Sequence, residues 1–127
     1  NKHVILTGGE PLLQVDENLV KCLKEKKFLV AVETNGSIES KIKFDWTCVS
    51  PKDPKRWLLK KGDELKIVYP QKLFNLDKLI YLDFKYFFLQ PKYNNLQKLN
   101  INKTIDYCKL NRPWFPSFQL HKTMGVM

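Results

Sequence analysis

Short apolar runs that end at turn-forming residues recur along the chain. They are rich in β-branched and aromatic side chains and have the length of buried strands. The runs cover residues 3–6, 28–32, 44–49, 64–68, 84–89 and 114–120. The last run contains Pro116, which lacks the N–H group that a strand ladder needs. Six strands are therefore predicted.

Segments with helical periodicity separate several of these strands. Asp16 is predicted to cap a first helix, and a short second helix is expected near Asn75. Ile101, Ile105 and Cys108 have the spacing of one face of a third helix. Strands that alternate with helices or long connections favour a parallel α/β sheet.

The length of 127 residues suits a single domain spanning residues 1–127. The chain begins with Asn1 and enters an apolar run almost at once, so we expect it to be a fragment, with sequence missing upstream. The lysine-rich stretch 52–62 is predicted to be an exposed loop or insertion.

The formal net charge of +9 comes from scattered lysines, because only Arg56 and Arg112 are arginines. There is no compact basic run and no aromatic RNA-recognition motif, so direct contact with nucleic acid is not expected. An anionic small substrate accounts for part of the charge equally well. A non-catalytic basic α/β module that binds nucleotides or RNA remains an alternative.

Three cysteines, Cys22, Cys48 and Cys108, lack the close spacing of a zinc or iron–sulfur site, and each is predicted to be a small buried side chain. Their odd number favours reduced thiols and a cytoplasmic location. No apolar run approaches the roughly 18 residues of a membrane span, so no association with a membrane is expected.

Four predicted strands end in distinctive polar segments, and ligands of parallel α/β sheets bind beyond the carboxyl ends of the strands. We therefore expect the four segments to lie side by side along the edge of the sheet where the strands end, which we call the rim. They are Thr7-Gly8-Gly9-Glu10-Pro11, Glu33-Thr34-Asn35-Gly36, Ser50-Pro51-Lys52 and Gln90-Pro91.

The segment with two glycines presents a bare backbone whose carbonyl groups can approach a ligand. Glu10 adds a negative charge and the segment has no P-loop lysine, so it suits an amino-acid ammonium group better than a phosphate. An ordinary link between a strand and a helix is the alternative.

The other three segments each have a ligand-binding and a plain structural interpretation. Glu33 is placed to accept hydrogen bonds from a ribose or to hold the neighbouring loop. Ser50 and Lys52 suit a carboxylate or a ribose, and the backbone of Gln90 suits an adenine edge. Simple turns, a solvated lysine and a strand end explain the same residues.

Taken in order, the segments resemble a known family. Gly8-Gly9-Glu10-Pro11 resembles the GGEP motif of radical S-adenosylmethionine enzymes, and the whole series resembles the 7-carboxy-7-deazaguanine synthases among them, from the first strand to the C-terminus. The further segments that carry this resemblance are Glu33–Gly36, Cys48–Lys52, Leu65–Val68, Leu89–Pro91 and Gln119–Lys122.

The resemblance implies a partial parallel (β/α) barrel of the radical S-adenosylmethionine type, incomplete at its N-terminus. It implies a lyase that converts 6-carboxy-5,6,7,8-tetrahydropterin to 7-carboxy-7-deazaguanine, with loss of ammonia, in queuosine and 7-deazapurine biosynthesis. The implied cofactors are S-adenosylmethionine, a [4Fe-4S] cluster and Mg²⁺. The implied partners are the pterin substrate, a second copy of the chain in a homodimer, and an electron donor such as flavodoxin.

The resemblance also assigns residues, although it places no catalytic residue in this chain. Two residues would contact the substrate: Thr7, and Met127 through its carboxylate if it is the true C-terminus. The residues expected to contact S-adenosylmethionine are Gly9, Ser50, Pro51, Lys52, Gln90, Pro91, Lys92 and Tyr93.

The metal ligands are expected outside the chain. In the family, the three cluster cysteines and the magnesium ligand precede the GGEP motif, so the chain by itself is expected to be inactive. Another radical S-adenosylmethionine enzyme, such as a glycyl-radical activase, would share GGEP. It is not expected to carry the Ser-Pro-Lys, Leu-Gln-Pro and His-Lys series.

Overall fold

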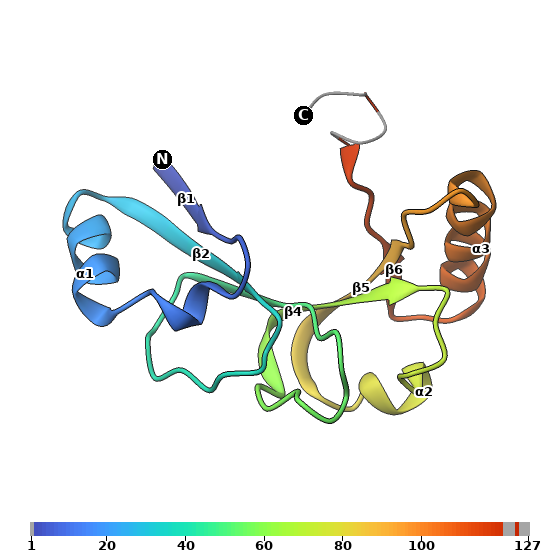
Figure 1. The fold of residues 1–127 in the computed structure, drawn as a ribbon, viewed down its shortest axis with the longest axis horizontal. Coiled ribbons are helices and arrows are strands. Elements are labelled where there is room, and N and C mark those ends of the chain that lie inside the picture. Colours follow the sequence, from blue (N-terminus) through green and yellow to red (C-terminus); the bar gives the residue numbers. More distant parts are fainter. Residues whose placement is uncertain (1, 121–123, 125–127) are drawn as a thin grey trace.

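The computed structural model describes residues 2–120 and Met124. Six strands form one sheet in chain order, every neighbouring pair is parallel, and the sheet curves into an open arch (Figure 1). The strands are β1 (Lys2–Leu6), β2 (Phe28–Thr34), β3 (Trp46–Val49), β4 (Lys61–Tyr69), β5 (Asp83–Pro91) and β6 (Trp114–Pro116). The predicted parallel α/β sheet is confirmed.

Among the described residues, four helical segments lie on the convex side of the arch (Figure 1). They are η1 (Pro11–Leu13), α1 (Glu17–Glu25), α2 (Leu76–Leu79) and α3 (Gln97–Leu110). Asp16 caps α1 as predicted, because its side chain accepts a hydrogen bond from the Leu19 amide at 2.8 Å. Asn75 caps α2 in the same way through the amides of Asp77 and Lys78.

The inner face of α3 differs from the prediction. Asn100, Thr104 and Cys108 are its buried residues, while Ile101 and Ile105 are only partly covered. The two polar residues tolerate burial because Asn100 donates to the Lys92 carbonyl and Thr104 donates to the Asn100 carbonyl.

Several strand boundaries also differ from the prediction, and for β3, β4 and β6 the structure shows where each strand begins or ends. β3 begins at Trp46 because the preceding Asp45 bonds Val30 with its side chain as well as its backbone. β6 is shorter than predicted and ends at Pro116, which cannot donate to the ladder. β4 is longer and begins at Lys61, which pairs with β5.

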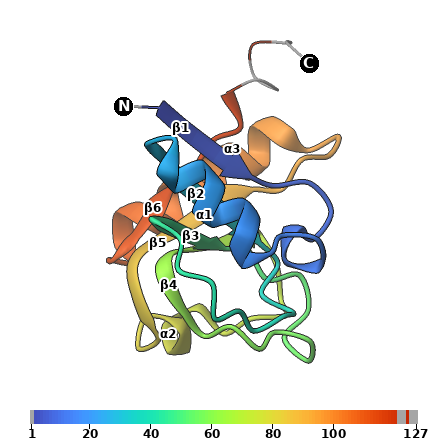
Figure 2. The same ribbon diagram turned by 90° about the vertical axis from the view of Figure 1, so that its left-hand side faces the viewer.

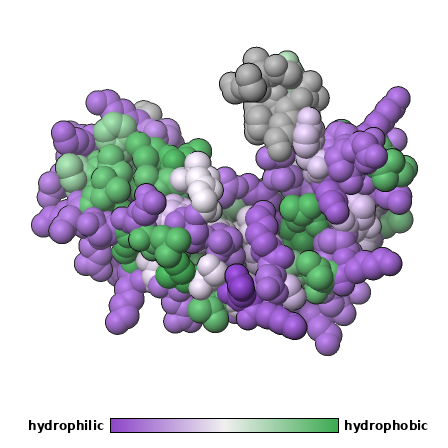
Figure 3. All heavy atoms as spheres, in the orientation of Figure 1, coloured by the Kyte–Doolittle hydropathy of each residue, from purple (hydrophilic) through white to green (hydrophobic). Residues whose placement is uncertain are grey.

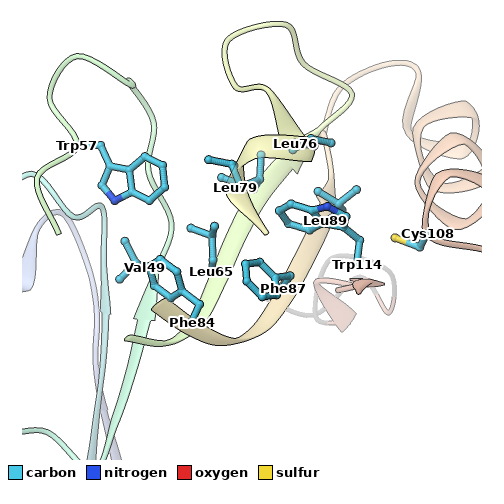
Figure 4. Packing of buried hydrophobic residues seen from close by; sticks show 11 residues of the cluster. Val49, Trp57, Leu65, Leu76, Leu79, Phe84, Phe87, Leu89, Cys108 and Trp114 are labelled. Atoms are coloured by element: carbon cyan, nitrogen blue, oxygen red, sulfur yellow. The ribbon is translucent and has the colours of Figure 1, made fainter. Parts of the chain in front are cut away.

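Side chains alternate between the two faces of the sheet, and the helices cover the convex one. On that face, one hydrophobic cluster contains residues of the four strands β3, β4, β5 and β6, which pack against residues of α2 and α3 (Figure 4). Within it, the rings of Phe87 and Trp114 meet edge to face at 5.5 Å. Its main members are Val49, Trp57, Leu65, Ile67, Leu76, Leu79, Phe84, Phe87, Leu89, Cys108 and Trp114.

The lysine-rich stretch 52–62 is not simply an exposed loop, so this prediction is wrong in part. Trp57 is 5% exposed and belongs to the core cluster. Its indole donates to the Leu59 carbonyl at 2.6 Å, and Lys60 lies 3.5 Å from the indole ring centre. Burial lowers the pKa of Lys60. The loop is thus anchored by one aromatic side chain.

The cysteines follow the prediction at two of three positions. Cys48 and Cys108 are buried, whereas Cys22 is exposed on α1. All three thiols are free. Cys22 lies on the solvent-facing side of an amphipathic helix, which the apolar character of the residue alone did not reveal.

Two glycines provide a matched test of this packing. Gly36 has φ +74°, and a Cβ there would lie 2.8 Å from both Trp57 and Val49. Gly36→Ala is therefore expected to lower the free energy of unfolding by about 2–4 kcal/mol. Gly9→Ala is expected to change it by less than about 0.5 kcal/mol, because no atom lies within 4 Å of the added Cβ. Urea denaturation measures both, and equal effects would contradict the packing.

Candidate cofactor-binding site at the carboxyl ends of the strands

Thr34, the last residue of β2, joins three of the predicted rim segments. Its buried hydroxyl donates to Oε1 of Glu10 at 2.6 Å and accepts from the Gly36 amide at 3.0 Å. Its carbonyl accepts from the Ser50 amide at 2.8 Å. One side chain and one carbonyl therefore hold together the loops after β1, β2 and β3.

Glu10 is fully engaged by the chain's own donors. Besides Thr34, its carboxylate accepts from the amides of Leu12 at 3.1 Å and Asn35 at 2.7 Å. Glu10 thus caps η1 and fastens the first loop to the second. The sequence suggested that Glu10 lies beside a ligand and that Glu33 either binds a ribose or holds the neighbouring loop. In the structure it is Glu10 that holds this loop.

Gly9 presents open backbone at this rim. It is exposed, and nothing lies within 4 Å of the position that a Cβ would take. Its φ is not in the left-handed region, whereas Gly8 has φ +122°. Neither packing nor backbone conformation within the described residues calls for glycine at position 9. The space beside it suits the amino-acid end of a ligand, and the exposed Thr7 lies two residues earlier.

The segment after β3 lies at a pocket of about 300 Å³. Pro51 is buried, and the exposed Lys52 extends its Nζ to 3.3 Å from the Ser50 hydroxyl. Lys72 and Lys92 line the same pocket as Lys52. None of these three lysines forms an ion pair with another described residue. The pocket therefore suits an anionic or hydroxyl-rich ligand.

The segment after β4 supplies a residue that sequence reasoning missed. Lys72 follows the Tyr69-Pro70 strand end, which lies at the same rim as the four chosen segments. The rule that ligands bind beyond strand ends applied to this segment too, but it carried no distinctive motif.

The predicted segment Gln90–Tyr93 ends β5 at this rim. Pro91 is buried opposite Tyr69 on β4, and the Lys92 amide donates to the Tyr69 carbonyl at 2.7 Å. The Lys92 carbonyl accepts from the Asn100 side chain at 2.8 Å. The backbone is thus fixed by β4 and α3, while Lys92 and Tyr93 have exposed side chains.

The concave face carries a second group of polar residues. The ammonium of Lys66 on β4 pairs with Oε1 of Glu33 on β2. Glu64, also on β4, accepts a hydrogen bond from the indole of Trp46 at 3.0 Å. The strand register aligns Glu33 with Cys48, and Cys48 with Glu64. Three strands therefore bring these charges side by side.

Burial and neighbouring charges set the protonation states in this group. Burial raises the pKa of the Cys48 thiol well above its usual range, so the thiol is neutral at pH 7. Burial alone would lower the pKa of Lys66, but the neighbouring Glu33 and Glu64 carboxylates outweigh burial and the pKa is raised. Because the thiol is neutral, the two carboxylates are the charges that hold Lys66 protonated at pH 7.

The polar groups of this rim fit a ligand that carries an amino-acid end and a ribose. Open backbone at Gly9, a hydroxyl at Ser50 and the lysines of the pocket match an amino-acid end and a ribose. Within residues 2–120 and Met124, no group of three or more His, Cys, Asp or Glu side chains is arranged to hold a metal ion. Met127, the second predicted substrate contact, lies outside the described residues.

The described part of the chain contains no candidate for a membrane-spanning helix. None of its helices combines the length and apolar character that crossing a bilayer requires.

The role of Thr34 in joining the loops predicts a specific cost for losing its hydroxyl. Thr34→Val keeps the shape but leaves the buried Gly36 amide without its acceptor, so it is expected to lower the free energy of unfolding by about 2–3 kcal/mol. Thr34→Ser keeps the hydroxyl and is expected to cost about 1 kcal/mol. Amide exchange at Gly36 should accelerate only in the valine variant. Equal destabilisation by the two variants would contradict this role.

The relatives found by comparison with known proteins share one name. The chain is 44% identical over 126 residues to a 7-carboxy-7-deazaguanine synthase of Bradyrhizobium diazoefficiens and 42% identical to one of Burkholderia multivorans. Each alignment covers 99% of this chain and 60% of the relative. A relative of the same name from Bacteroides thetaiotaomicron is 37% identical, with 97% of this chain and 64% of the relative covered. No family model matches the chain.

The chain thus spans about three fifths of the length of these relatives, and the matched stretch includes all six strands and the whole rim. These alignments extend over nearly the whole chain, and they agree with the family resemblance of the strand-end segments. Over the stretch that it covers, the chain belongs to the 7-carboxy-7-deazaguanine synthase family.

Proposed function

We propose that the intact protein is a radical S-adenosylmethionine lyase that converts 6-carboxy-5,6,7,8-tetrahydropterin to 7-carboxy-7-deazaguanine in queuosine biosynthesis. One observation carries the proposal. The open backbone of Gly9, held in place through Thr34, lies in a chain that is 44% identical to a relative of that name.

The fold belongs to the proposal as well. The described arch, a partial (β/α) barrel, belongs to one radical S-adenosylmethionine core domain, of which residues 1–127 are the C-terminal portion. Six parallel strands in chain order and the curvature of the sheet support this assignment. The iron–sulfur and magnesium ligands belong to the rest of the intact protein.

The cofactor supplies the radical chemistry when it is bound to the cluster, and the residues of this chain hold it in position. The Gly9 backbone receives the ammonium group of its amino-acid end. Ser50, Pro51 and Lys52 contact its ribose or carboxylate. Gln90, Pro91, Lys92 and Tyr93 contact the adenine. The lysines around the pocket support the carboxylate role, and the fixed backbone at Lys92 supports an adenine-reading edge.

The substrate and the partners follow the same assignment. The Thr7 hydroxyl, exposed beyond β1, contacts the pterin. The protein acts in the cytoplasm as a homodimer, receives electrons from a donor such as flavodoxin, and needs neither a membrane nor nucleic acid. The open inner surface of the arch supports the need for further protein around it.

The decisive experiment uses the intact protein with an anaerobically reconstituted cluster. Incubation with S-adenosylmethionine, Mg²⁺, a reductant and 6-carboxy-5,6,7,8-tetrahydropterin is expected to yield 7-carboxy-7-deazaguanine, detected by mass spectrometry. Residues 1–127 alone, treated identically, are expected to yield none. Absence of the product from the intact, cluster-loaded protein would refute the proposal.

The placement of the cofactor has its own prediction. Gly9→Val puts a branched side chain where the ammonium end approaches, so the dissociation constant for S-adenosylmethionine is expected to rise at least about tenfold, measured by anaerobic calorimetry. Thermal stability should stay unchanged, because the chain leaves that space open. An unchanged affinity would contradict the placement of the amino-acid end at Gly9.

A further inference from the structure

The charges on the concave face do not balance. Glu33 and Glu64 contribute two carboxylates, Lys66 contributes one ammonium group, and the neighbouring Cys48 is neutral. The side chain of Lys66 is only 15% exposed. A partly buried group of this kind requires hydrogen-bond donors for every carboxylate oxygen that lacks water.

The polar contacts of the Glu33 carboxylate all involve one of its two oxygens. Oε1 receives the Lys66 ammonium and lies 3.8 Å from the Cys48 sulfur. The Glu33 side chain is 36% exposed, and no described residue is seen to donate to Oε2. Lys66 therefore fixes one oxygen and leaves the other available to a ligand.

Glu64 is held in place by different contacts. Its Oε2 accepts from the Trp46 indole at 3.0 Å, and the Trp46 ring stacks on Tyr86 with centres 5.7 Å apart. The aromatic row continues across the face to Phe88 and Phe115. Glu33 lies at the end of β2 beside the predicted rim, whereas Glu64 lies against this aromatic row.

We propose that Lys66 is a positioning residue, which holds the Glu33 carboxylate so that its second oxygen accepts a hydrogen bond from an N–H or O–H donor of a ligand in the concave face. Such donors are the ribose hydroxyls of S-adenosylmethionine and the ring N–H groups of the pterin. The proposal rests on the proposed function and adds to it a role for Lys66, to which the resemblance assigns none.

The experiment is a double-mutant cycle in the intact, cluster-loaded protein. Lys66→Met, Glu33→Gln and the double variant are titrated by calorimetry, separately with S-adenosylmethionine and with 6-carboxy-5,6,7,8-tetrahydropterin. Lys66→Met is expected to weaken one of the two ligands about tenfold in the native background and less than about twofold beside Glu33→Gln. Lys66→Arg is expected to restore most of the affinity. The ligand that responds identifies the source of the donor.

Two controls separate positioning from general stability. Lys85→Met removes another lysine of the sheet, which pairs with Asp63 at 2.6 Å, and should leave both affinities unchanged. Thermal unfolding of each variant shows whether it is folded, and Lys66→Gln replaces Lys66→Met if the latter does not fold. Additive effects in the cycle, or native affinity for both ligands in folded Lys66→Met or Lys66→Gln, overturn the proposal. If the native protein forms no product, the proposed function fails instead.

Discussion

The rim depends above all on the hydrogen bonds of Thr34. Parallel strands bring their carboxyl ends to one edge, but they do not fix the loops that follow. Thr34 supplies that constraint, because its hydroxyl binds Glu10 and Gly36 while its carbonyl binds Ser50. These groups are buried or half-buried, so an unpaired donor among them would be costly. Gly9 and Lys52 therefore extend from a fixed base even though both are exposed.

Much of this arrangement could be predicted from the sequence, because strand patterns and strand-end motifs are local features. The six runs, the parallel order and the common rim all follow from hydrophobic periodicity and connection lengths. The errors occurred where a distant partner decides the outcome. Trp57 is buried only because Gly36 leaves room for it, and β3 starts late because Asp45 bonds β2. Neither contact has a signature within its own segment.

The concave face was the least predictable part, for a physical reason. Glu64 and Lys66 alternate with the buried Leu65 and Ile67, a pattern that also describes a strand with one solvated face. Only the curvature of the sheet assigns these charges to the inside of an arch, and only the register sets Lys66 near Glu33. Whether a charged side chain on a strand faces open solvent or the inside of the arch therefore depends on the shape of the whole sheet.

The inner surface near β1 shows what the chain requires from its surroundings. Ile5 is 65% exposed and Leu29 is 41% exposed, and both line an apolar groove of about 370 Å³. Apolar atoms gather over this end of the arch (Figure 3), and β1 forms its edge (Figure 2). An exposed apolar face beside an unpaired strand favours association with other polypeptide.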